Sequence, residues 1–83
     1  MRITFKTAGI LAKYLPAGTK GLAAPLDVAE DATARDVMAQ LGLPMAERYL
    51  VALNGALVPS AERAAKRLAE GDELAIMPPL KGG

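Results

Sequence analysis

The sequence contains no cysteine and no histidine. Without cysteine, the chain has neither a disulfide nor a thiolate nucleophile. Without histidine, it lacks the side chain that most often acts as a general base near neutral pH, and the absence of both residue types removes the usual ligands of zinc. We therefore expect no metal site and no bound cofactor, and we expect the chain to contribute little catalytic chemistry of its own.

Aromatic residues and long apolar runs are also scarce. The chain has no tryptophan, two tyrosines and one phenylalanine, so its core must consist mainly of aliphatic side chains. No apolar segment approaches the roughly 20 residues that cross a bilayer, and the N-terminus lacks the basic and apolar regions of a secretory signal. These features predict a cytoplasmic protein that does not bind a membrane.

Neither sign of charge dominates. Ten lysines and arginines stand against nine aspartates and glutamates, and no basic cluster is interleaved with aromatic residues, which argues against a nucleic-acid partner. At 83 residues the chain forms one small domain, and its 52% hydrophobic content places it among folded rather than disordered proteins. A domain of this size leaves little room for a deep active-site cleft.

Two segments in the first third of the sequence alternate apolar and polar residues, as strands with one buried face do. In residues 2–6, Ile3 and Phe5 alternate with polar side chains and are expected to enter the core. Residues 22–28 carry apolar side chains at the even positions. Pro25 cannot donate a backbone hydrogen bond, which predicts that this second strand lies at an edge of the sheet.

The middle of the sequence predicts one substantial helix. Thr33 can cap its start, Asp36 three residues later completes a capping box, and Gly42 followed by Pro44 ends the helix. A shorter helical turn is expected at residues 10–15, where apolar residues recur at spacings of three and four before a proline.

The second half predicts a hairpin and a last strand. Asn54 and Gly55 lie between two apolar runs, and this pair tolerates the positive φ angles of a type I′ turn. Residues 60–72 are compatible with either a short alanine-rich helix or a mostly irregular connection. Residues 73–77 alternate again and predict a strand.

This order of elements provides only one main helix to cover a single sheet. The first and last strands have the most continuous apolar faces, so we expect them to lie side by side in parallel at the centre of the sheet. The predicted fold is α+β, a β-grasp domain with a mixed sheet packed on one main helix over residues 1–77, and an extended tail over residues 78–83. The predicted core consists of Ile3, Phe5, Leu26, Val28, Val37, Leu41, Val51, Leu53, Leu68, Leu74 and Ile76.

The sheet face turned away from the helix is predicted to carry small or apolar groups. Its residues are Thr4, Ala52, Ala75 and Met77, with Lys6, Arg48 and Lys81 as a polar rim. Isolated exposed apolar residues are normal on any protein surface. Clustered beside the start of the tail, these residues would instead form a docking patch for a partner protein.

The sequence finishes with PPLKGG, residues 78–83. The two prolines cannot continue a ladder as donors, so we expect the tail to leave the sheet as a stiff arm that reaches roughly 20 Å. The two glycines have the narrowest cross-section of any residue and fit a tunnel in a partner. The remaining tail residues predicted to contact that partner are Pro78, Pro79, Leu80 and Lys81. A frayed terminus is the alternative.

The chemistry of a carboxyl terminus also requires a partner. A free α-carboxylate is an anion at neutral pH and a poor electrophile until its charge is removed. The chain has no phosphate-binding loop with which to activate its own carboxylate. If the tail is functional, the carboxylate of Gly83, which follows Gly82, is the reactive centre and another protein activates it.

Two stretches resemble a known family. The segment LVALNGALV, residues 50–58, is similar to a strand and Asn-Gly turn of the ubiquitin-like sulfur carriers of the MoaD/ThiS type. The segment LAEGDELAIMPPLKGG, residues 68–83, is similar to the last strand and Gly-Gly terminus of that family. The resemblance extends over essentially the whole chain and implies a β-grasp fold with a functional C-terminal glycine.

The resemblance implies that Gly83 is adenylated by an ATP-using enzyme similar to ubiquitin-activating enzymes and then becomes a thiocarboxylate. Pro78 and Pro79, together with the inserted residues 10–21, look most like the small subunit of molybdopterin synthase. In that case the large synthase subunit receives the tail, sulfur passes to the precursor of the molybdenum or tungsten cofactor, and this chain is a non-catalytic, sulfur-carrying subunit. The alternatives are a carrier for thiamine thiazole, tRNA thiolation or cysteine synthesis, and a ubiquitin-like protein modifier.

Overall fold

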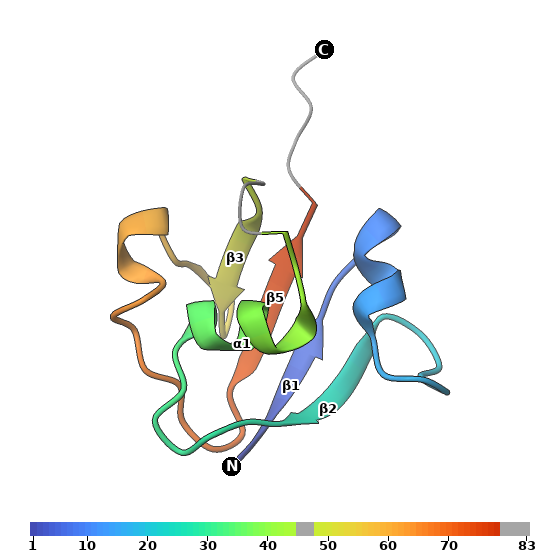
Figure 1. The fold of residues 1–83 in the computed structure, drawn as a ribbon, viewed down its shortest axis with the longest axis horizontal. Coiled ribbons are helices and arrows are strands. Elements are labelled where there is room, and N and C mark those ends of the chain that lie inside the picture. The colour runs from blue at the N-terminus through green and yellow to red at the C-terminus, as the bar shows by residue number, and fades with distance from the viewer. Residues whose placement is uncertain (45–47, 79–83) are drawn as a thin grey trace.

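The computed structural model describes residues 1–44 and 48–78, and in these residues one sheet is covered on one face by one α-helix (Figure 1). In chain order the elements are β1 (Arg2–Lys6), the 3-10 helix η1 (Gly9–Tyr14), β2 (Ala23–Asp27), α1 (Ala34–Leu41), β3 (Leu50–Leu53), β4 (Ala56–Leu57), the 3-10 helix η2 (Ser60–Glu62) and β5 (Glu73–Met77). None of the helices in the described ranges has the length and apolar character needed to cross a bilayer.

The strand order in the sheet is β2-β1-β5-β3-β4. β1 and β5, the first and last strands of the sequence, are parallel neighbours at the centre, and the other pairs are antiparallel. Pro25 lies on the edge strand β2, where its missing N–H costs no ladder hydrogen bond. The predicted β-grasp, including the parallel central pair and the edge position of β2, is confirmed.

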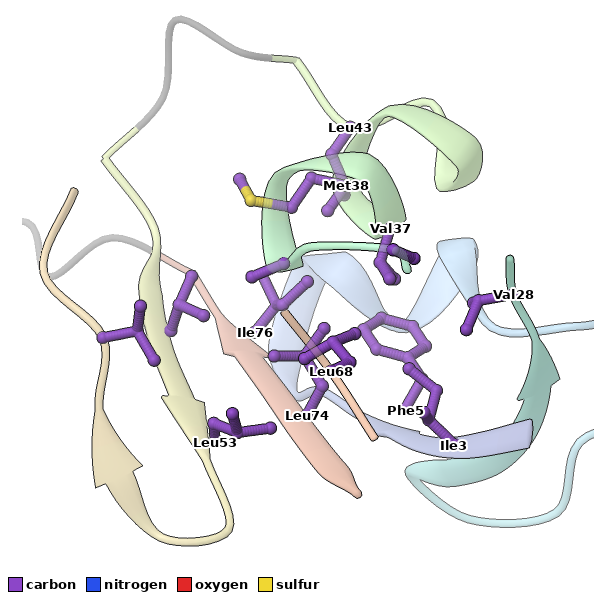
Figure 2. Close-up of a cluster of buried hydrophobic side chains, with 14 of the residues drawn as sticks. Ile3, Phe5, Val28, Val37, Met38, Leu43, Leu53, Leu68, Leu74 and Ile76 are labelled. Atoms are coloured by element: carbon purple, nitrogen blue, oxygen red, sulfur yellow. The ribbon is translucent and has the colours of Figure 1, made fainter. Parts of the chain in front are cut away.

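The core lies between the sheet and α1 (Figure 2). Of the predicted core residues, Leu26 and Leu41 are only half-buried, because Leu26 belongs to an edge strand and Leu41 to the last turn of α1. The other predicted core residues are buried. The structure adds buried side chains that the alternation did not predict, and the larger of these are Leu11, Met38, Leu43, Tyr49 and Val58.

The predicted capping box begins α1. The Thr33 side-chain oxygen accepts a hydrogen bond from the Asp36 backbone N–H at 3.2 Å, and an Asp36 carboxylate oxygen accepts one from the Thr33 N–H at 2.9 Å. Gly42 ends the helix with a left-handed φ of 79°. Both helix termini are therefore set by local sequence, as the spacing of Thr33, Asp36 and Gly42 predicted.

Replacement of the cap gives a testable change in stability. Thr33→Ala removes the side-chain acceptor for the Asp36 N–H, and we expect the free energy of unfolding in urea to fall by about 1 kcal/mol. Thr33→Ser keeps the hydroxyl and should stay within a few tenths of a kcal/mol of the wild type. If both variants lose the same stability, the methyl group of Thr33 and not its hydroxyl would carry the effect.

The predicted hairpin joins β3 to β4 and is bound to the start of β5. Asn54 and Gly55 have φ angles of 51° and 87°, the positive values that a type I′ turn needs. The Asn54 side chain accepts a hydrogen bond from the Glu73 N–H at 2.8 Å and donates one to an Asp72 carboxylate oxygen at 3.0 Å. Residues 60–72 form a mostly irregular connection, since η2 is their one short helical turn in the described chain.

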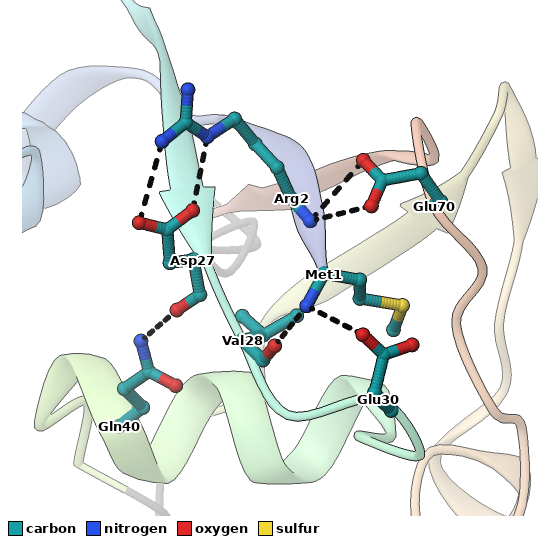
Figure 3. Close-up of polar contacts among 7 residues, drawn as sticks. All are labelled: Met1, Arg2, Asp27, Val28, Glu30, Gln40 and Glu70. Carbon is teal, nitrogen blue, oxygen red and sulfur yellow. Dashed lines mark hydrogen bonds and ion pairs between the residues drawn. The ribbon is translucent and has the colours of Figure 1, made fainter.

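Polar contacts fix the N-terminal strand to β2 and the loop after it (Figure 3). The Met1 amino group donates a hydrogen bond to the Val28 carbonyl oxygen at 2.8 Å and pairs with Glu30 at 3.3 Å. Arg2 Nε donates to Asp27 Oδ1 at 2.9 Å. This hydrogen bond, together with the positive charge of Arg2, lowers the pKa of the Asp27 carboxyl below its ordinary value.

The lowered pKa of Asp27 predicts how stability responds to acid. A carboxyl whose pKa is depressed by folding stabilises the fold above its unfolded pKa, and the contribution is lost as the pH falls through the folded pKa. We expect Asp27→Asn to be slightly less stable than the wild type at neutral pH and equally stable in acid. Both side chains of the pair are exposed, so the difference should also shrink in high salt. Urea unfolding at two pH values tests this, and a difference that persists in acid would contradict it.

Candidate functional site

Strand β5 brings the chain to the point where the predicted tail begins. It is central in the sheet, paired with β1 on one side and β3 on the other, and its last residue, Met77, lies opposite Leu50. Pro78 follows and is half-buried. The predicted tail contacts Pro79, Leu80 and Lys81, and the predicted reactive residues Gly82 and Gly83, lie outside the described residues.

The residues predicted for the outer face of the sheet lie together. Ala52 is opposite Ala75 across β3 and β5, and Ala75 is opposite Lys6 across β5 and β1. Thr4 and Met77 lie on the same face of β1 and β5, two residues along from Lys6 and Ala75 respectively. Thr4, Ala52, Ala75 and Met77 are each half-buried. We call this surface, formed by Thr4, Leu50, Ala52, Ala75 and Met77, the outer face.

One ion pair lies beside these small side chains. Lys6 Nζ is 2.7 Å from Glu73 Oε1, and each of the two side chains is 46% exposed. The Lys6 charge that the sequence assigned to a polar rim is therefore neutralised across the two central strands. Arg48 is exposed at the end of the described segment that leads into β3, and Lys81 lies outside the described residues.

Two large apolar residues on this side of the sheet were not among the predicted docking residues. Leu50 is 41% exposed beside Met77, and Leu57 is 72% exposed opposite Ala52, at the edge of the sheet. The alternation that places Val51 in the core also places Leu50 on the opposite face, so this signal was present in the sequence. The position of Leu57 opposite Ala52 follows from the two-residue turn, which fixes the register of β4 against β3.

The chemical groups on the outer face suit binding better than catalysis. The face offers methyl groups, a thioether, a threonine hydroxyl and one neutralised ion pair, and these groups lie on rigid central strands. Exposed apolar groups at the centre with polar groups at the margin are typical of protein–protein interfaces. The fold brings Thr4, Ala52, Ala75 and Met77 together and Leu50 enlarges this surface, and its use as a docking patch stays a prediction.

Comparisons with known proteins agree with this architecture. The ThiS family model matches residues 16–83. A search of curated proteins finds no match. Among solved structures, SAMP1 from Haloferax volcanii is 27% identical, with 100% of each chain covered and a TM-score of 0.69.

Two further structures share the fold at lower identity. The thiamine biosynthesis protein ThiS from Geobacter metallireducens is 22% identical, with 100% of each chain covered and a TM-score of 0.68. A chain from the complex of subunits 1 and 2 of molybdopterin-converting factor from Helicobacter pylori 26695 is 20% identical, with 100% of each chain covered and a TM-score of 0.61.

Proposed function

The chain belongs to the ThiS family of ubiquitin-like sulfur carriers, and from this premise we propose that it carries sulfur on the carboxylate of Gly83. The observation that carries the proposal is that the family match runs to Gly83, five residues after the described chain leaves the central strand β5 at Pro78. In this proposal residues 1–77 are the folded carrier domain and residues 78–83 are the tail that partners receive.

The proposed reaction has two steps, both catalysed by a partner that resembles ubiquitin-activating enzymes. The Gly83 carboxylate first attacks the α-phosphorus of ATP, which forms an acyl adenylate and releases pyrophosphate. A hydrosulfide ion supplied by the activating system then attacks the carbonyl carbon of the adenylate and displaces AMP, which leaves a thiocarboxylate on Gly83. ATP binds to the partner, and the carrier contributes the carboxylate and the docking surface. Because the reaction consumes ATP, we place the carrier in the cytoplasm.

We propose molybdopterin biosynthesis as the destination of the sulfur. The support is in the sequence: the Pro78-Pro79 pair before the tail, and the insertion between β1 and β2 that contains η1, both resemble the small subunit of molybdopterin synthase. The large synthase subunit would then receive the tail and catalyse the transfer. Thiamine thiazole, thiolated tRNA and cysteine are the competing destinations.

Mass spectrometry and copurification test the two levels of this proposal separately. Intact-mass analysis of the protein from its native cell should show a fraction of molecules in which one oxygen is replaced by sulfur. The persistent absence of this species, even after incubation with the activating enzyme, ATP and a sulfur source, would overturn the carrier function. The chain should copurify with a molybdopterin synthase large subunit, which would identify the acceptor. A stable complex with a thiazole-forming enzyme would overturn molybdopterin biosynthesis as the destination of the sulfur.

Protein modification is the second candidate. It is favoured by the similarity of the whole chain to SAMP1 from Haloferax volcanii. A second similar crystal structure is that of the small archaeal modifier protein 1 from the same organism. A modifier would form an isopeptide bond between Gly83 and a lysine amine of a target. Trypsin cleavage after Lys81 would leave a Gly-Gly remnant on that lysine, which peptide mass spectrometry detects.

The outer face predicts where an activating enzyme docks. Met77→Glu places a charge between Leu50 and Ala75 on this face, and we expect the dissociation constant for the activating enzyme to rise by about tenfold or more. Ala61→Glu adds the same charge at an exposed position of η2 and serves as the control. Unchanged affinity of the Met77 variant, measured by calorimetry, would mean that docking uses another surface.

A further inference from the structure

Two contacts outside the outer face hold the carboxyl end of β5. Thr7 follows β1 and is buried, and its hydroxyl donates a hydrogen bond to the Ile76 carbonyl oxygen at 2.7 Å. Gly9 begins η1 with a positive φ of 59°, and a Cβ built there would lie 3.4 Å from Cγ of Pro78. One contact therefore holds Ile76, the residue before Met77, and the other lies against Pro78, the residue after it.

The Thr7 hydroxyl donates to β5 beyond the last paired residues of the two central strands. The parallel pairing of β1 with β5 extends to Lys6 and Ala75. The Thr7 backbone N–H is donated to the Leu22 carbonyl oxygen at 3.0 Å, on the β2 side of β1. The side chain instead supplies the donor toward β5 and extends the connection between the central strands. Thr7 and Tyr49 are the buried side chains with a polar group in residues 1–44 and 48–78, and the other buried side chains are apolar.

The segment η1 lies at the end of the sheet where β5 ends (Figure 1). Since Gly9 has no side chain, the start of η1 approaches Pro78 closely, and the left-handed backbone at Gly9 is accessible without the strain that other residues incur. The insertion between β1 and β2 thus packs against the residue from which the tail continues.

We propose that Thr7 and Gly9 are positioning residues that set the direction in which the tail leaves the sheet. The proposal rests on the function assigned to Gly83. The five residues after Pro78 span at most about 18 Å, so a small rotation at Pro78 becomes a large displacement at Gly83. Reacting atoms must approach to roughly 3–3.5 Å, and holding Ile76 and Pro78 reduces the volume that the carboxylate samples.

The contact itself is tested in the isolated chain by ¹⁵N relaxation at the Met77 amide. Thr7→Val keeps the shape of the side chain and removes the hydroxyl, whereas Thr7→Ser keeps the hydroxyl. We expect the Met77 order parameter to fall below the rigid value of about 0.85 in Thr7→Val and to be retained in Thr7→Ser. Thr19→Val is the matched control, because the Thr19 hydroxyl also donates to a backbone carbonyl, that of Pro16 at 2.6 Å, in the loop that leads from η1 to the edge strand β2. Equal order in Thr7→Val and the wild type would overturn the proposal.

The positioning role is tested by the kinetics of adenylation, followed as pyrophosphate release with the activating enzyme and ATP. We expect Thr7→Val to lower kcat by about tenfold and to leave KM for the carrier within about twofold, because the outer face is unaltered. Thr7→Ser should restore kcat. Gly9→Ala should lower kcat, because an alanine strains the left-handed backbone (φ 59°) that brings η1 into contact with Pro78.

The relaxation and kinetic measurements test the Thr7 contact and the positioning role separately. A reduced order parameter with an unchanged kcat would overturn the positioning role, as would a rise in KM without loss of kcat. If the wild-type chain is never adenylated, the function assigned to Gly83 fails, and the relaxation comparison still decides whether Thr7 holds the end of β5.

Discussion

Removal of Gly82 and Gly83 is expected to abolish thiocarboxylate formation while the free energy of unfolding stays the same. The truncated chain would finish at Lys81, so its carboxylate would lie two residues, at most about 7 Å, short of the reactive position of Gly83. That carboxylate would also belong to a residue with a bulky side chain. In the described part of the chain, every buried core residue lies at or before Ile76, so the deletion removes none of the core. Intact mass after incubation with the activating enzyme, ATP and a sulfur source measures the first effect, and urea unfolding measures the second.

Gly83→Ala is the matched control for this deletion. It keeps the length of the tail and adds one methyl group, so it separates the need for a carboxylate at the right distance from the need for a narrow residue. We expect a rate of sulfur loading below that of the wild type but above that of the deletion. Equal loading of Gly83→Ala and wild type would contradict a narrow channel, and sulfur on the truncated chain would show that Gly83 is not the reactive residue.

Much of the fold was predictable because its signals are local. The capping box needs only Thr33 and Asp36, and the hairpin turn needs only Asn54 and Gly55. Each signal acts through backbone and side-chain atoms within a few residues, so it works in the same way in any fold that contains it. Pro25 acts similarly, because its missing N–H restricts β2 to an edge in any sheet.

The remaining features depend on contacts between distant parts of the chain. Leu11 is buried in the core whereas its neighbour Ile10 is 73% exposed, and the apolar spacing in residues 10–15 did not show which of the two would pack inward. The Thr7 hydrogen bond joins residues 69 positions apart, and the Lys6–Glu73 pair requires the parallel register of β1 and β5. A periodic pattern shows which face of a strand is buried, but it does not identify the partner across the sheet.

The same distinction applies to the candidate site. The outer face was predictable in outline, since the residues between inward-facing ones on β1, β3 and β5 must face outward. Leu50 belonged to that pattern and follows from the inward position of Val51. By contrast, Thr7 and Gly9 were not predictable as neighbours of Ile76 and Pro78, because their contacts arise only when the insertion after β1 meets the end of β5.

Phe5→Ala is expected to cause the largest loss of stability of any single change considered. Phe5 is the one phenylalanine of the chain, it is 0% exposed, and it lies on β1 between Ala24 of β2 and Leu74 of β5. Its ring is directed toward α1, near Val37 (Figure 2). Truncation removes much of the contact between the sheet centre and the helix, and the rigid strands on both sides limit how far the cavity can collapse.

We expect Phe5→Ala to reduce the free energy of unfolding by about 3–5 kcal/mol, against a total of about 4–12 kcal/mol for a domain of this length. Phe5→Leu leaves a smaller cavity and should lose less than half as much, whereas Lys6→Ala, at an exposed position of the same strand, should lose under about 1 kcal/mol. Urea unfolding of the three variants tests the order. Equal losses for Phe5→Ala and Lys6→Ala would mean that the ring does not fill the space between the sheet and α1, and the packing that holds β5 at the centre of the sheet would then need another source.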